Sequence, residues 1–156
     1  MMVGLDVPRP TRQTPRPGRQ GDSRPVTDDE FLDAFERCVL PKRQFSHAGH
    51  LRLAYLYLRR HGRVRGGRVF RLGVRRYAGA VGADALYNET LTTFWWQMVA
   101  DALARHRHVR SAAALVSCEP QLADRGLQYR YWSRDLLKSS RARLVWTEPD
   151  LAPLAA

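Results

Sequence analysis

Four segments of the chain place apolar residues three and four positions apart, which is the spacing of an amphipathic helix. They span about 27–40, 46–61, 70–81 and 88–106. No segment keeps the alternation of apolar and polar residues that a half-buried strand requires, and no internal repeat is present. Shorter helices are predicted near 111–118 and 133–137. The pattern therefore predicts an all-α fold, a compact bundle of four main helices with short C-terminal helices.

Capping and helix-breaking residues indicate where these helices begin and end. A capping box opens the first helix at Thr27, and Pro41 ends it. Ser46 is the expected N-cap of the second helix, and Gly62 is its expected C′ residue. We expect residues 62–67 to form a loop that leads into the third helix.

Length and composition predict one folded domain with a tail. The chain has 156 residues, of which 44% are hydrophobic, enough for a single core. Residues 1–26 are rich in Pro, Gly and Arg, so we expect a disordered tail there and one helical domain over 27–156. The chain has no long apolar run and no apolar start typical of a signal peptide, which predicts a cytoplasmic protein without a membrane partner.

The chain is strongly basic, with 26 basic and 15 acidic residues and a formal net charge of +11. Nearly all basic residues are arginine, a preference that GC-rich codon usage also produces. No acidic residue lies between Glu36 and Asp84, where twelve basic residues accumulate, and this placement favours an anionic partner. Cys38 and Cys118 lack metal-site spacing, and we expect both to be small core residues.

Two histidines lie at the start of the second helix. Helical geometry places His47 on the apolar face, with His50 and Tyr57 on one flank of it, whereas Arg52 and Leu56 are expected to point away. Inward histidines at i and i+3 fit metal binding or acid–base catalysis. Each is also explained as a hydrogen-bonded core histidine, so the pair favours a functional role only modestly.

Glu89 is the candidate general base on the fourth helix. It lies at the edge of the apolar arc, on the same side of the helix as Thr92 and Trp96. A carboxylate partly shielded from water by indole rings is suited to accept a proton. The helix dipole explains an acidic residue in the first turn equally well.

Two further segments are candidates for ligand contact. Gly66-Gly67-Arg68 is predicted to open the third helix, where backbone N–H groups can bind an anion, although a flexible basic connection is the simpler explanation. The run 128–132 interleaves aromatic residues with Arg130, which suits base stacking, a cavity wall or ordinary core packing. P-loop, dinucleotide-binding, serine-hydrolase and zinc motifs are absent from the sequence.

The motifs H-x-x-H-x-R at 47–52 and Y-x-E-T at 87–90 resemble those of a family of small bacterial all-helical proteins, and the resemblance covers about residues 28–154. In that family a histidine typically precedes the glutamate, whereas this chain has Asn88, which argues against a three-histidine metal site. The chain is also similar to cofactor-free cyclases of natural-product pathways, such as Pictet–Spenglerases. This resemblance implies a lyase or cyclase that uses acid–base chemistry.

Together, these observations favour an enzyme that needs no cofactor and acts on a small aromatic or anionic substrate. Glu89 would be the general base, and His47 or His50 the proton donor or orienting group. The predicted substrate-binding residues are Arg52, Tyr57, Arg68, Tyr87, Thr92, Trp95 and Trp96. A mononuclear metal enzyme built on the same histidines and Glu89, and a nucleic-acid-binding module using the basic stretch, remain as alternatives. Homodimer formation also stays open.

Overall fold

The computed structural model of the protein describes residues 24–154, which are mainly helical and contain no strand. This confirms the all-α prediction. The predicted tail, residues 1–26, lies outside the described residues except for its last three. The helices are α1 Asp28–Glu36, α2 His47–Ala80, α3 Glu89–Arg105, α4 Ala112–Cys118, α5 Arg134–Lys138 and α6 Ser140–Leu144. Short 3₁₀ helices lie between them: η1 Lys42–Gln44, η2 Asp84–Leu86, η3 Pro120–Ala123 and η4 Leu127–Arg130.

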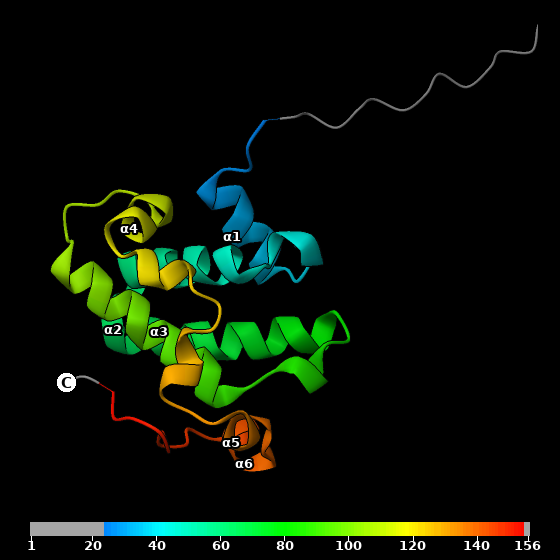
Figure 1. The fold of residues 1–156 in the computed structure, drawn as a ribbon. Coiled ribbons are helices and arrows are strands. Elements are labelled where there is room, and N and C mark those ends of the chain that lie inside the picture. Colours follow the sequence, from blue (N-terminus) through cyan, green and yellow to red (C-terminus); the bar gives the residue numbers. More distant parts are fainter. Residues whose placement is uncertain (1–23, 155–156) are drawn as a thin grey trace, which may run out of the picture.

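Helix α2 consists of two arms that meet at Gly62, whose φ of +71° and ψ of −178° are accessible to glycine alone. The arms run back along each other (Figure 1), with Gly66 against the carbonyl oxygen of Tyr57 and Gly73 against its ring. The predicted end of the second helix at Gly62 is therefore confirmed. The predicted loop over 62–67 is wrong, because the helix resumes directly after the break.

Gly66 and Gly67 lie inside this second arm because a tryptophan packs on them. A Cβ atom at Gly66 would lie 2.7 Å from the Trp96 ring, and one at Gly67 would lie 2.8 Å from it. The two glycines thus let α3 approach the arm closely, and this contact outweighs the low helix propensity of glycine. The prediction that this segment opens a helix is wrong, because the helical arm already resumes directly after Gly62.

Helix α1 begins with the predicted capping box, in which Thr27 and Glu30 bond reciprocally. It ends at Glu36, so the predicted end at Pro41 is wrong, and Cys38 takes a positive φ of 59° in the turn that follows. Cys38 is partly buried, but Cys118 is exposed, so the prediction of a core position is wrong for Cys118. Cys118 is the last residue of α4, a surface helix that buries only Leu115 among its own residues.

The main core lies between α1, α2, α3 and α4. A smaller core is formed by Trp132 together with Phe94 of α3, Leu127 and Leu137. Leu56 is buried in the main core, contrary to the prediction that it points away. Trp132 is fully buried, and its Nε1 donates a hydrogen bond of 2.9 Å to the carbonyl of Thr147. Figure 1 shows α5 and α6 on the side of the α2–α3 layer opposite α1. The helices predicted near 111–118 and 133–137 are confirmed as α4 and α5, while α6 is an additional element.

Candidate functional site

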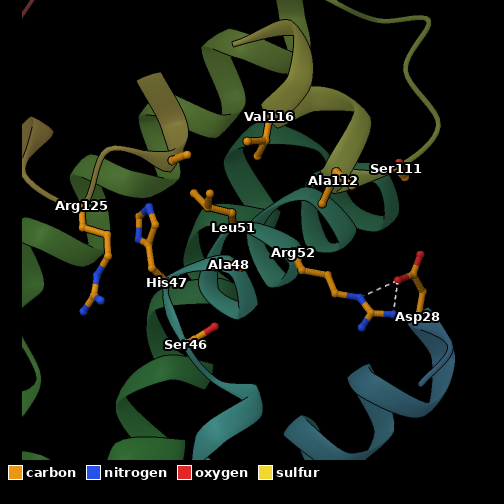
Figure 2. Close-up of a pocket in the computed structure, with 12 residues that line it drawn as sticks. Asp28, Ser46, His47, Ala48, Leu51, Arg52, Ser111, Ala112, Val116 and Arg125 are labelled. Atoms are coloured by element: carbon orange, nitrogen blue, oxygen red, sulfur yellow. Dashed lines mark hydrogen bonds and ion pairs between the residues drawn. The ribbon is translucent and has the colours of Figure 1, made fainter. Parts of the chain in front are cut away.

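A cavity of about 840 Å³ lies between α1, the first turns of α2 and α4 (Figure 2). Its apolar lining consists of small and aliphatic side chains: Ala48, Leu51, Ala112, Ala113, Val116 and Ala123. Its polar lining consists of Asp28, Ser46, His47, Arg52, Ser111 and Arg125. An apolar hollow of this size with a few polar groups is typical of a site for a small organic molecule.

His47 is the first residue of α2 and is fixed by contacts on two sides. Its Nε2 lies 2.7 Å from the carbonyl oxygen of Leu122, and its ring packs edge-on against Trp95 with centroids 4.5 Å apart. Because a carbonyl oxygen only accepts hydrogen bonds, Nε2 donates, and Nδ1 is the basic nitrogen of the neutral ring. The structure thus sets the tautomer of a histidine in the cavity wall.

The two arginines of the cavity differ in their surroundings. Arg52 donates from Nε to Asp28 over 2.7 Å and from a terminal nitrogen to the carbonyl of Val26 over 2.8 Å. The guanidinium of Arg125 has no hydrogen-bond or ion-pair partner within residues 24–154. Figure 2 shows Arg125 beside His47, across the cavity from Arg52. Arg125 is therefore a positive charge that is available to a ligand.

His50 lies one turn beyond His47 but does not line this cavity. Its ring stacks on Phe45 at 3.8 Å, and its Nδ1 donates to the carbonyl of Ser46 over 2.8 Å. Burial lowers the pKa of His50 below its ordinary value, the hydrogen bond to Ser46 opposes this shift, and the charge of His47 adds to it. His50 therefore resists protonation in the folded protein.

The lowered pKa of His50 predicts a loss of stability on mild acidification. The unfolded chain binds a proton near the ordinary histidine pKa of about 6.5, while folded His50 stays neutral, so the free energy of unfolding falls as the pH drops from 7 to 5. The slope of one such group is at most about 1.4 kcal/mol per pH unit. Urea unfolding at several pH values measures it. His50→Asn, which keeps an N–H for Ser46, should flatten the curve, whereas an unchanged curve would contradict this assignment.

Glu89 lies at the start of α3 within a different set of contacts. Its Oε2 accepts a hydrogen bond of 2.5 Å from the Tyr87 hydroxyl, and its Oε1 forms an ion pair of 3.1 Å with Arg71. Burial raises the pKa of Tyr87, and the hydrogen bond to Glu89 raises it further. Glu89 does not line the cavity that contains His47. The structure thus does not bring His47, His50 and Glu89 together around one space.

The Y-x-E-T motif anchors the C-terminal segment to α3. Asn88 caps the helix by accepting from the Leu91 N–H over 3.0 Å, and its amide donates to the carbonyl of Leu137 over 2.8 Å. Thr90 donates to the carbonyl of Val145 over 3.0 Å. Asn88, the residue that departs from the family pattern, therefore makes two structural hydrogen bonds at once.

The other predicted substrate-binding residues are dispersed. Tyr57 is buried, with its hydroxyl 3.2 Å from a carboxylate oxygen of Glu36, and Thr92 bonds to the carbonyl of Asn88. Trp96 packs on glycines of α2, and Arg68 is exposed. Of the predicted set, Arg52 lines the cavity and Trp95 contacts His47. Sequence reasoning missed Ser111, Val116 and Arg125, because no local pattern links them to His47.

Four of the twelve basic residues between Glu36 and Asp84 form ion pairs with acidic residues of other helices. The ion pairs that cross between elements are Arg52–Asp28, Arg60–Asp29, Arg63–Asp101 and Arg71–Glu89. Among residues 24–154 no group of three or more His, Cys, Asp or Glu side chains is arranged to hold a metal ion. The nucleic-acid and metal alternatives both remain predictions.

Comparison of the chain with protein-family models, with curated proteins and with solved structures found no match. The resemblance to small bacterial helical proteins and to cyclases therefore stays a prediction. Within the described residues, no helix combines the length and apolar character needed to cross a bilayer.

Proposed function

We propose that the protein is a cofactor-independent enzyme that binds a small organic anion in the cavity at His47 and moves a proton through this histidine. The observation that carries the proposal is the placement of His47, with a fixed tautomer, in the wall of an 840 Å³ cavity beside Arg125, whose guanidinium is unpaired within residues 24–154. Imidazole is the side chain best suited to exchange a proton near neutral pH.

The cavity supplies the two kinds of contact that such a substrate needs. Leu51 and Val116 offer apolar surface for an aromatic or aliphatic body, and the Arg125 guanidinium can bind a carboxylate or sulfonate through two parallel hydrogen bonds. The first turn of α2 borders the cavity, and its positive end adds to the attraction for an anion. Arg52 contributes less, since Asp28 already balances its charge.

In this proposal His47, rather than Glu89, is the residue that accepts the proton, because Arg71 and Tyr87 already bind the two carboxylate oxygens of Glu89. Ring closure or condensation of an aromatic, anionic substrate is the reaction class we propose, on the basis of the resemblance to natural-product cyclases. In such a reaction Nδ1 of His47 would remove the proton that is lost after the new bond forms.

Arg125→Gln should weaken binding of an aromatic anion about tenfold or more, the effect of losing a charge-assisted hydrogen bond. The probe is 8-anilinonaphthalene-1-sulfonate, titrated by fluorescence against the folded protein. Arg134→Gln is the matched control, because Arg134 is also exposed but lies on α5 over Tyr129, away from the cavity. Equal binding by wild-type and Arg125→Gln, or equal weakening in both variants, would exclude Arg125 as the anion-binding group.

A further inference from the structure

A second cavity, of about 430 Å³, lies at the other end of the molecule, between the C-terminal part of α2, η2 and α6. Its lining residues are Arg75, Asp84, Ala85, Tyr87, Ser140, Arg143 and Leu144. None of them lines the cavity at His47. The second cavity is therefore a separate candidate site.

Two arginines from distant parts of the chain converge on this space. Arg75 comes from α2, with its guanidinium 6.0 Å from the ring centre of Tyr87, and Arg143 comes from α6. Neither guanidinium has a hydrogen-bond or ion-pair partner within residues 24–154. Arg143 is only partly exposed, whereas Arg75 is exposed. In the part of the chain that the structure describes, the two arginines therefore have no anionic partner.

The carboxylates nearby do not supply it. Glu89 is engaged by Arg71 and Tyr87, so its charge is already balanced. Asp84 is the acidic residue of the lining, so the cavity has two positive side chains and one negative side chain. Asp84 makes no ion pair among the described residues, so it lowers the positive potential of the cavity without neutralising either guanidinium.

We propose that this second cavity binds the phosphate group of a small phosphorylated molecule, with Arg75 and Arg143 as its ligands. Two guanidinium groups present paired N–H donors to the oxygens of one dianion, and the Ser140 hydroxyl adds a further donor in the lining. The volume exceeds that of phosphate alone, and Leu144 and Ala85 provide apolar contact for the organic part of the ligand. The inference is independent of the proposed function at His47.

Calorimetric titration with phenylphosphonate, a dianion that cannot be hydrolysed, tests this site. We use protein carrying Arg125→Gln, which removes the anion-binding group proposed for the cavity at His47. In it we expect saturable binding that persists in sodium chloride of matched ionic strength, and at least a tenfold loss of affinity when Arg143→Gln or Arg75→Gln is added. Arg134→Gln, an exposed arginine elsewhere, should bind as wild-type does. Asp84→Asn should bind several times more tightly, since it removes a repulsive charge, a gain that a purely structural role for these residues does not predict.

Three outcomes would overturn the proposal. They are no binding of phenylphosphonate, the same affinity with and without Arg143→Gln, and displacement of phenylphosphonate by a twelve-nucleotide oligothymidylate that binds more tightly than phenylphosphonate does. The last result would assign the arginines to a nucleic-acid backbone instead, whose affinity falls steeply with salt. Amide chemical shifts of Tyr87 and Ser140 locate the bound phosphonate even if one variant is unstable.

Discussion

Replacing His47 by Gln is expected to lower turnover by about 10²–10⁴-fold, the usual contribution of one well-placed acid or base, with little change in melting temperature. The glutamine amide can still donate to the Leu122 carbonyl, as Nε2 of His47 does. It has no nitrogen able to accept a proton, so only the chemical role is lost. Turnover is measured by mass spectrometry on anions that displace 8-anilinonaphthalene-1-sulfonate from the cavity.

His50→Asn is the matched control for this experiment. Asparagine retains an N–H for the Ser46 carbonyl, and His50 does not line the cavity, so turnover should stay near the wild-type value. If His47→Gln keeps full turnover, the proton-transfer role is wrong. If both variants lose it equally, the effect comes from the start of α2 as a whole rather than from His47.

Gly67→Ala is expected to lower the free energy of unfolding by about 2–3 kcal/mol, the cost of overpacking a close contact. The added methyl group would lie 2.8 Å from Nε1 of Trp96, and the ring cannot withdraw because Phe70 packs against it at 5.3 Å. In an unobstructed helix interior the same change would stabilise the protein by about 1 kcal/mol, so even the sign is informative. Urea denaturation measures the difference.

A double-mutant cycle separates this contact from other effects of the alanine. Trp96→Leu removes the ring that faces Gly67, and it destabilises the protein on its own by leaving space in the core. In that background Gly67→Ala should be neutral or stabilising. The same destabilisation with and without Trp96 would show that the close contact is not the reason glycine is needed here.

Local sequence was enough to predict the helices and many of their ends. Thr27 and Ser46 cap α1 and α2 as predicted, and Gly62 breaks α2 where its backbone must take a positive φ. Such signals depend on hydrogen bonds and torsions within a few residues, and apolar spacing depends only on helical geometry. They failed over 63–67, where a contact with Trp96 keeps two glycines helical.

The candidate site was predictable only in part. Helical spacing directed His47 toward the interior, and the structure places it at a cavity beside Trp95. The same reasoning could not show that Arg71 would pair with Glu89, or that Glu89 would not line the cavity at His47. It also could not foresee that Arg52, Arg60 and Arg63 of the basic stretch would pair with acidic residues of α1 and α3.

The sequence by itself determined that this protein is helical, roughly where each helix begins, and which side chains near the start of α2 turn inward. Only the tertiary structure decided that Arg125 lies beside His47, that Arg75 and Arg143 line one cavity, and that both cavities exist at all. Helix formation follows from interactions between near neighbours in the chain. A cavity depends on how distant helices pack, and that packing leaves no periodic trace in the sequence.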